Sequence, residues 1–440
     1  MQDLIRNAVE CYYECHEDYL IADTFASACY NNSDKFNGFK LDEFNHEVVR
    51  HMVEYEKEEK EYILITGATG YLGNHFLKRL IDNHPNEKIL ILTRRFNLPR
   101  ISENVEYILS SMIDVFDLDP RLKKVKEVYH FAAYVKHDDT PNVWEESLNS
   151  NVIATIMMYF LAYFNRAKFV YLSTSGTVAF HSDDASLMSR MPYYASKRDI
   201  EEIMNELCQL YPIHGAIIRP SMMLGPKVNL FGLKNIYERN ILEKIKNHTI
   251  LFSASGIVNF VDVRYVTDLC YCVYKMNLDT KFLSLNAMGP NMNMGDFFAK
   301  VSEINGWTKY YIPNTLAYLF TFVGIISKTE YEMTNIGWYY RCPDRDEFLK
   351  VCKQEHNMTG FKYYEVYPIE QTLVIDNKLL TESISKEESE ESEESEESEE
   401  EKLEESEESE ESEEESEESE ESEESEEEES EESEESKEVQ

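Results

Sequence analysis

The sequence predicts an α/β protein built on a Rossmann-type doubly wound parallel sheet, and three observations support this prediction. Short apolar runs alternate with stretches of helical periodicity between residues 62 and 220. The runs are continuously apolar, as expected of strands that are buried on both faces. The first run leads directly into a glycine-rich turn and then a helix, which is how a right-handed βαβ unit begins.

Strands are expected at six places in this part of the chain. They cover residues 62–66, 88–93, 105–109, 127–133, 168–174 and 215–220. Beyond Gly225 the pattern is less regular, which is typical of a smaller subdomain formed by later insertions. We therefore predict a main α/β domain over residues 61–225 and a substrate-binding subdomain over residues 226–384 that adds late elements to the sheet.

Two segments of different character flank this body. Residues 1–60 are expected to form a helical extension, since Phe44, Val48, Val49, Met52 and Tyr55 recur at helical spacing. Residues 385–440 are Glu/Ser repeats, which have too few apolar side chains to offset the entropy of ordering and are expected to be disordered. From residue 387 onward, 35 Glu and 2 Lys carry −33 of the net charge of −42. The body is therefore only mildly acidic, and we find no basic block for nucleic acid.

The cysteines and the apolar stretches bear on location and on metal binding. None of the 8 cysteines forms a CxxC pair, so we expect reduced thiols, no metal site and a cytoplasmic protein. The N-terminus has early acidic residues and no long apolar core of the kind found in a secretory signal. One long uncharged stretch, residues 310–327, is short for a bilayer span and is interrupted by Pro313. We expect it to be a buried helix beside the substrate, with membrane contact as the less favoured alternative.

The glycine-rich turn has the properties of a phosphate site. The first expected strand runs into TGATGYLG, residues 66–73. Gly67 allows a tight turn, Gly70 lets the backbone approach a pyrophosphate, and Gly73 lets the helix and the strand pack closely. The helix N-terminus offers free N–H groups and the positive end of its dipole. The residues predicted to bind the cofactor here are Gly67, Thr69, Gly70, Tyr71, Leu72 and Gly73.

The segment TGATGYLG resembles the TGATGFLG or TGGAGFIG signature of the extended short-chain dehydrogenases/reductases, and the resemblance extends through the body of the chain. This superfamily includes the NAD-dependent epimerases/dehydratases and the thioester-reductase-like proteins. The resemblance implies an oxidoreductase that binds a nicotinamide dinucleotide in the main domain and its substrate in the smaller subdomain.

The end of the second strand distinguishes NADP from NAD. An NAD site places an acidic residue there for the ribose 2′-hydroxyl, whereas an NADP site needs a cation for the 2′-phosphate. The chain has Arg94 and Arg95 and no acid. We therefore expect NADP rather than NAD. After the third strand the family usually has Gly-Asp near the adenine; here Ser111 takes the place of the acid, and Asp114 is the alternative.

Later segments extend the resemblance to the nicotinamide side of the cofactor. HFAA, residues 130–133, matches the family's HxAA, which implies that the cofactor lies against Ala132 and Ala133. Asn151, in a segment resembling NVxGT, is expected to support the site. Pro220 lies in RPSMMLGP, which resembles the family's RPxxVxGP and is expected to cover the nicotinamide.

The catalytic residues are expected in two segments. Tyr193 and Lys197 form a YxxxK motif, and residues four apart emerge on one face of a helix. A neighbouring ammonium favours the phenolate form of a tyrosine, so the pair can act as an acid or base near neutral pH. The resemblance implies that Lys197 also binds the nicotinamide ribose. LSTSGTV, aligned with the family's SSSATV, places Ser175 on the substrate oxygen, with Thr174 as the alternative.

Three branches of the family catalyse different reactions, and their motifs can be compared with this sequence. Dehydratases carry an acidic pair after the Ser/Thr, where this chain has Ser175-Gly176. Epimerases have the more similar serine motif but hold NAD, which Arg94 argues against. The VDVRYV segment, residues 261–266, resembles the VPVDYV of thioester reductases. We therefore favour an NADP-dependent reductase of a carbonyl or acyl-thioester substrate.

Two further hypotheses are kept beside this one: a nucleotide-sugar 4-epimerase and a non-catalytic NADP-binding scaffold. The expected partner is a small molecule, either lipophilic or thioester-linked, and the sequence leaves a homodimer open.

Overall fold

The computed structural model describes residues 41–116, 118–178, 191–233, 245–247, 249–252, 255–277, 282–323 and 369–373, with single positions 3, 5, 6, 9, 242, 325, 326, 331, 366 and 367. The chain divides into two compact units, Met1–Ile375 and Asp376–Gln440. All elements given below belong to the first unit. The predicted Glu/Ser tail lies outside the described residues.

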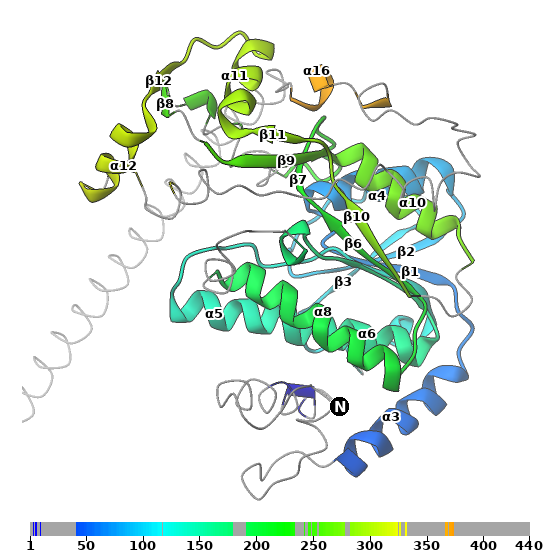
Figure 1. Ribbon diagram of the computed structural model, residues 1–440. Helices are drawn as coiled ribbons and strands as arrows, with labels where there is room; N and C mark the ends of the chain where they lie inside the picture. Colours follow the sequence, from blue (N-terminus) through cyan, green and yellow to red (C-terminus); the bar gives the residue numbers. More distant parts are fainter. Residues whose placement is uncertain are drawn as a thin grey trace, which may run out of the picture. The chain divides into compact units, whose positions relative to one another are not determined.

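A seven-stranded sheet forms the centre of this unit, in the order β10-β6-β5-β4-β1-β2-β3, and every pairing in it is parallel (Figure 1). The strands are β1 (Tyr62–Thr66), β2 (Lys88–Thr93), β3 (Val105–Leu109), β4 (Val125–His130), β5 (Lys168–Leu172), β6 (Gly215–Pro220) and β10 (Phe282–Ala287). The strand order reverses between β1 and β4, and open α/β sheets bind ligands at the carboxyl ends of the strands beside such a reversal. The predicted fold class is confirmed.

Helices cover both faces of this sheet, and each face has its own apolar core (Figure 1). One core packs β-strand residues against α3 (Leu41–Glu56), α6 (Ala154–Asn165) and α8 (Pro192–Leu210). The other packs them against α4 (Tyr71–Asn83) and α10 (Val263–Lys275). A short helix, α5 (Pro141–Ser147), continues through a π-helical turn (Leu148–Ile153) into α6. Strands that are covered on both faces explain why their sequences are continuously apolar.

The smaller elements follow β6. A three-stranded sheet contains β7 (Met222–Leu224), β9 (Ile257–Asp262) and β11 (Asn291–Asn293), and a two-stranded one contains β8 (Ile250–Phe252) and β12 (Tyr310–Ile312). The helices here are α11 (Met294–Ile304), α12 (Asn314–Phe322) and α16 (Ile369–Thr372). The Asn259 side chain connects β9 to β11 by donating to Asn291 Oδ1 at 3.1 Å, and its own Oδ1 accepts from Gly289 N at 3.0 Å.

The predicted strands agree with the structure except at their ends. β4 begins at Val125 and ends at His130, and β5 ends at Leu172. The sequence predicted that these strands continue to residues 133 and 174. The extra residues are Phe131 to Ala133 after β4 and Ser173 and Thr174 after β5. They leave the sheet to form loops at its carboxyl end, and an apolar pattern alone does not mark where a strand ends.

Helix α3 presents a different face from the one that the spacing predicted. Val48 and Tyr55 are buried as expected, but Val49 is 59% exposed. His51 is buried instead, with its ring stacked on Phe164 at a centroid distance of 5.1 Å and an interplanar angle of 18°. The buried face of α3 therefore includes His51 and not Val49, which hydrophobic spacing alone did not predict.

The prediction of a buried helix within residues 310–327 is wrong. In α12 only Ala317 is buried, whereas Leu319 is 58% exposed and Phe322 is 72% exposed. The one helical stretch among the described residues that is long and apolar enough to cross a membrane is Pro141–Asn165. Within its apolar 18-residue segment, 78% is buried inside the protein, as expected of a core helix.

The thiols agree only in part with the expected reduced state. Cys208 and Cys270 are free, and burial raises the pKa of both. Cys272 is disulfide-bonded, so the expectation of reduced thiols throughout is wrong at this position.

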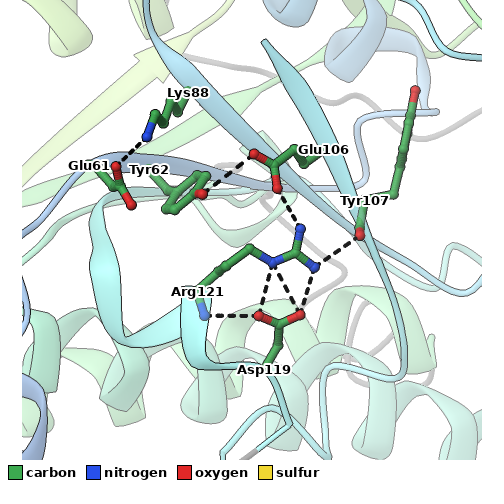
Figure 2. A network of polar contacts seen from close by, with 7 residues as sticks. All are labelled: Glu61, Tyr62, Lys88, Glu106, Tyr107, Asp119 and Arg121. Atoms are coloured by element: carbon green, nitrogen blue, oxygen red, sulfur yellow. Dashed lines mark hydrogen bonds and ion pairs between the residues drawn. The ribbon is translucent and has the colours of Figure 1, made fainter. Parts of the chain in front are cut away.

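An ion-pair network occupies the amino-terminal end of the sheet (Figure 2). Arg121, in the 3₁₀ turn η1 (Pro120–Lys124), donates to Glu106 Oε2 at 2.6 Å and to Asp119 Oδ2 at 2.6 Å. Lys88, at the start of β2, pairs with Glu61 at 2.5 Å. These contacts tie the starts of the strands together at the end opposite the ligand-binding edge.

Candidate active site

The turn between β1 and α4 requires glycine at two positions. Gly67 has φ +68°, and a Cβ there would lie 2.5 Å from the backbone nitrogen of Ala132. A Cβ on Gly73 would lie 2.2 Å from the carbonyl oxygen of Gly67. Both distances are shorter than a real contact, so a side chain at either position would push the turn away from α4 or from the end of β4.

The third glycine of the turn is placed differently. Gly70 is the N-cap of α4, no side chain caps the helix, and a Cβ there would have one neighbour within 4 Å, Gly67 O at 3.2 Å. The first N–H groups of α4 lack helical partners, and the helix end carries partial positive charge. The side chains of Tyr71 and Leu72 are buried, so these residues can reach a ligand only through their backbones. The turn therefore fits the pyrophosphate of a dinucleotide.

The start of α4 is also tied to the segment after β6. Tyr71 donates its hydroxyl proton to Gly225 O at 2.8 Å, and His75 Nε2 lies 2.9 Å from Pro226 O. Pro220 is the buried last residue of β6. The predicted phosphate turn and the predicted cover of the nicotinamide are thus linked by hydrogen bonds.

Arg94 and Arg95 follow the last residue of β2, and both side chains are exposed. Among the described residues neither guanidinium has a hydrogen bond or ion pair. The backbone of Arg95 donates to Thr93 Oγ1 at 3.1 Å, which fixes the turn that carries both side chains. Ser111 accepts from Ile113 N at 3.3 Å, and Asp114 is exposed beyond it.

A buried histidine locks the ends of β1 and β4 to α6. His130 Nδ1 lies 2.7 Å from Thr66 Oγ1, and its Nε2 lies 2.9 Å from Thr155 Oγ1. Burial, with a contribution from the charge of Lys197, lowers the pKa of His130 to about 3, so the ring is neutral. Ala132, whose nitrogen donates to Thr66 Oγ1 at 3.3 Å, and the exposed Ala133 follow as the predicted small residues.

Asn151 braces the loop after β4 from within the π-helical turn. Its Oδ1 accepts from Tyr134 N at 2.8 Å, and its Nδ2 donates to Tyr134 O and Ser196 Oγ, both at 3.0 Å. The side chain is fully buried. These bonds use both ends of the amide, so Asn151 holds the loop after β4 and α8 in place.

The serine segment forms a 3₁₀ turn, η3 (Ser175–Thr177), after β5. Thr174 caps this turn, because its Oγ1 accepts from Gly176 N at 3.3 Å. The residue Ser175 is almost fully buried, and within the described part of the chain its hydroxyl has no hydrogen bond. The Thr174 hydroxyl uses one acceptor position in this cap, whereas the Ser175 hydroxyl makes no bond among the described residues, which favours Ser175 as the group that binds a substrate oxygen.

Tyr193 and Lys197 lie in the first turns of α8, which begins at Pro192. Tyr193 is half-buried, whereas Lys197 is fully buried. Lys197 Nζ donates to Leu172 O at 2.8 Å and lies 4.5 Å from the centroid of the Tyr171 ring. Burial lowers the pKa of Lys197 to about 7, and the negative charge of Glu201 acts in the opposite direction.

Glu201 is a buried carboxylate that sequence reasoning did not single out. Its oxygens accept from Arg219 Nη2 at 2.7 Å, from Thr177 Oγ1 at 3.0 Å and from Ser173 Oγ. It therefore joins α8, the serine turn and the end of β6. Its position, four residues after Lys197 on the same helical face, is the signal that could have identified it.

The structure thus brings most of the predicted residues to one end of the sheet. The glycine turn, the arginines and the alanines follow β1, β2 and β4, and the serine turn follows β5 and contacts α8. Among the described residues, no group of three or more His, Cys, Asp or Glu side chains could hold a metal ion.

This arrangement is matched by a known protein family. Residues 63–281 match the model of the NAD dependent epimerase/dehydratase family. The chain belongs to this family. It is therefore a member of the extended short-chain dehydrogenases/reductases, as the sequence predicted, and the family is NAD(P)-dependent.

Several curated relatives of the chain are named as enzymes of nucleotide sugars. The chain is 27% identical over 242 residues to a putative UDP-glucose 4-epimerase of Methanocaldococcus jannaschii, covering 53% of this chain and 76% of that protein. It is 30% identical over 172 residues to the bifunctional protein gal10 of Schizosaccharomyces pombe, covering 34% of this chain and 24% of that protein. The chain spans about half the length of the UDP-glucose 4-epimerases of pea and guar that it matches, 48% and 49%.

A solved structure shows the same fold. The crystal structure of gox2253 superposes with a TM-score of 0.52 at 21% identity, covering 66% of this chain and 93% of that one. This likeness concerns the fold alone.

Proposed function

We propose that this family member is an NAD(P)-dependent enzyme that oxidises and reduces a secondary carbon of a nucleotide sugar, in the manner of a 4-epimerase. The observation that carries the proposal is the position of Ser175 in the turn after β5, which Thr177 connects to Glu201 of α8, while Lys197 near the start of α8 donates to Leu172 O at the end of β5. The names of the curated relatives support a nucleotide sugar as the substrate. This replaces the reductase that the sequence favoured with the alternative that it kept beside it.

The proposed mechanism assigns one task to each side chain. Tyr193 takes the proton of the sugar hydroxyl during oxidation and returns it during reduction. The free Ser175 hydroxyl donates a hydrogen bond to the same oxygen and fixes its position. Lys197, when protonated, favours the phenolate form of Tyr193. Hydride acceptance and return is the chemistry that a bound nicotinamide supplies.

The lowered pKa of the buried Lys197 amine makes this mechanism depend on pH. A pKa of about 7 means that the amine is protonated in only part of the molecules near neutral pH. Its present acceptors, Leu172 O and the Tyr171 ring, are neutral. A phenolate on Tyr193 would add an opposite charge on the same helical face, and opposite charges stabilise each other's ionised forms in a buried site.

The cofactor side of the proposal is NADP. Arg94 and Arg95 are exposed and unpaired at the end of β2, where a ribose 2′-phosphate is recognised in this fold. Guanidinium groups form short, charge-assisted hydrogen bonds with phosphate. No acidic residue follows β2 directly to bind a 2′-hydroxyl.

A second candidate is an NADPH-dependent reductase of a carbonyl or acyl-thioester compound. The same arginines favour it, since dissociable NADPH is the reductant of that branch. The exposed apolar side chains of α12 would suit a lipophilic substrate. The acidic pair expected of a dehydratase is missing, because Gly176 follows Ser175.

The test follows the sugar and the cofactor separately. Purified protein is incubated with UDP-glucose, UDP-galactose or UDP-N-acetylglucosamine and a small amount of NADP⁺ or NAD⁺, and the sugars are analysed by NMR. Epimerisation at C4 without net formation of reduced cofactor supports the proposal. Consumption of NADPH with ketones or acyl thioesters, and no change in any nucleotide sugar, would replace it with the reductase.

A further inference from the structure

His137 lies in the loop between β4 and α5, and its ring contacts both tyrosines at the start of α8. The imidazole is stacked on Tyr194, with ring centroids 5.3 Å apart and an interplanar angle of 22°. It meets Tyr193 edge to face, at 5.5 Å and 85°. The two tyrosine rings also contact each other at 5.2 Å. His137 is therefore held in a defined orientation beside the proposed catalytic phenol.

One nitrogen of this ring has no partner. His137 Nδ1 is buried and has no hydrogen bond among the described residues. Burial lowers the pKa of His137, opposed by the charge of Asp138, so the neutral ring is favoured. A buried polar atom without a partner costs about 1–3 kcal/mol, and native structures contain few of them.

Other histidines near the sheet are used differently. Both nitrogens of His130 are bonded within the core, and His75 Nε2 lies 2.9 Å from Pro226 O. His51 lies within α3, where its ring is stacked on Phe164 and its Nε2 lies 3.3 Å from Arg50 Nη2. His137 thus combines an unpaired nitrogen with ring contact to Tyr193.

We propose that His137 Nδ1 binds an oxygen of the substrate on a carbon next to the one that is oxidised. The inference rests on the proposed function, because it takes Tyr193 as the group that contacts the reacting hydroxyl. The loop after β4 lies at the carboxyl end of the sheet, where ligands of this fold bind. A bound hydroxyl would satisfy the nitrogen and so offset the cost of leaving it unpaired.

The chemistry of the nitrogen narrows the substrate class. A neutral imidazole nitrogen either donates or accepts, depending on its tautomer. A sugar hydroxyl can serve either tautomer, whereas a carbonyl or thioester oxygen can only accept. A polyol with adjacent oxygens therefore pairs with His137 in both tautomers, and a nucleotide sugar that reacts at C4 presents its 3-hydroxyl as the neighbouring group. His137 is thus assigned as the residue that recognises this hydroxyl.

Two substitutions separate the nitrogen from the ring. His137→Phe keeps an aromatic ring to stack on Tyr194 but removes the hydrogen bond. His137→Asn removes the ring but places an amide atom close to the position of Nδ1. His84→Phe is the matched control, because His84 lies at the C-terminal end of α4 and packs on Tyr274 at 4.9 Å.

The experiment measures kcat/KM with UDP-glucose and with UDP-3-deoxyglucose, together with the affinity for NADPH. With the intact sugar we expect His137→Phe to lower kcat/KM about 10-fold, the equivalent of one hydrogen bond. The same substitution should have no effect with the deoxy sugar. His137→Asn should recover most of the loss, and NADPH affinity should stay constant in all variants.

Different results would overturn the assignment of His137 and the proposed function. Equal losses by His137→Phe on both sugars, or a loss that His137→Asn does not recover, would mean that the ring only supports Tyr193, and would overturn the assignment. Unchanged kinetics in both variants would overturn it too. If the unaltered protein converts no nucleotide sugar but reduces carbonyl compounds, the proposed function fails, and the recognition of a sugar hydroxyl fails with it.

Discussion

The two ends of the central sheet differ in whether their polar side chains are paired within the protein. At the amino-terminal end, Arg121 and Lys88 are paired with carboxylates in the network of Figure 2. At the carboxyl-terminal end, polar atoms are left without partners. Among the described residues these are the Arg94 and Arg95 guanidiniums, the Ser175 hydroxyl, His137 Nδ1, Ser221 Oγ and Asn286 Oδ1.

This difference distinguishes groups that stabilise the fold from groups that are kept for a ligand. Paired surface charges add modestly to stability and leave nothing for binding. A buried polar group without a partner lowers stability unless a ligand satisfies it, so a fold tolerates such groups where binding takes place. The exposed guanidiniums of Arg94 and Arg95 are hydrated and carry no such cost. Glu201, His130 and Asn151 are exceptions at the carboxyl end, since their polar atoms are hydrogen-bonded inside the protein.

The largest expected effect comes from removing the phenol at the carboxyl end. Tyr193→Phe should lower kcat about 1,000-fold or more, since general acid–base groups contribute in this range. NADPH affinity should be unchanged. The measurement is steady-state epimerisation of UDP-glucose with cofactor titration by fluorescence.

Tyr62→Phe is the matched control at the amino end, where the Tyr62 hydroxyl donates to Glu106 Oε1 at 3.4 Å. It should leave kcat at the wild-type value. Turnover retained by Tyr193→Phe would refute the assignment of the acid–base group.

A smaller effect is expected from the buried carboxylate. Glu201→Gln leaves the Arg219 cation without its charge partner, which should lower the free energy of unfolding by about 3–5 kcal/mol. It should also lower kcat about 10- to 100-fold, because the serine turn that carries Ser175 loses its anchor, while the Kd for NADPH changes little. Urea unfolding and kinetics below the unfolding transition measure both quantities.

Glu106→Gln is the corresponding change in the network of the amino end. It removes one of the two carboxylate partners of the partly exposed Arg121, so we expect a loss of under about 1 kcal/mol and a normal kcat. Equal kcat values for Glu201→Gln and the wild type would show that the serine turn does not depend on this carboxylate.

Arg94 should affect the choice of cofactor more than the reaction. Arg94→Asp removes a charge-assisted hydrogen bond to a 2′-phosphate and adds repulsion, so NADPH affinity should fall about 10- to 100-fold. NADH affinity should change little. Arg166→Asp, an exposed arginine paired with Glu56, is the control. If NADPH and NADH weaken equally, the 2′-phosphate site lies elsewhere.

The sequence predicted the parts of this site that depend on backbone geometry. Glycines at 67 and 73 are required by contacts that a Cβ cannot make, and such requirements leave a fixed spacing in the sequence. The strands were predicted because burial on both faces leaves a continuous apolar run. The YxxxK spacing was readable because a helix places its two members on one face.

The rest depends on contacts between distant segments. The spacing of Glu201 from Lys197 places both on one helical face, but its partners Arg219 and Ser173 come from other elements and are not indicated by that spacing. His137 is a single histidine in a loop and has no periodicity. The exposure of α12 was missed because an uncharged stretch has the same composition whether it is buried or exposed.

The pH dependence of stability should reveal the buried imidazole. The folded pKa of His130 is about 3, below the usual 6.5. Below about pH 6.5 the unfolded chain therefore takes up a proton that the folded protein cannot hold. Stability should fall as the pH drops from about 6.5 towards 3, by up to about 1.4 kcal/mol per pH unit from this group.

His130→Gln should remove this contribution, so the stabilities of variant and wild type should converge as the pH falls. Urea unfolding at several pH values from about 7 to about 5 measures the difference. A difference that is independent of pH would mean that His130 titrates alike in both states.

A small effect is expected at the other end of the sheet, and it tests whether the two ends are independent. Arg121→Met breaks the ion pairs to Glu106 and Asp119, but these groups are partly exposed, so water screens much of their attraction. We expect the free energy of unfolding to fall by about 1 kcal/mol, with kcat and NADPH affinity at wild-type values. The network ties the strand starts, whereas the catalytic groups are held by Glu201, Asn151 and His130 at the opposite end. A changed kcat at unchanged folding would mean that strain passes along the strands, and the division of polar groups between the two ends would then not be a division of function.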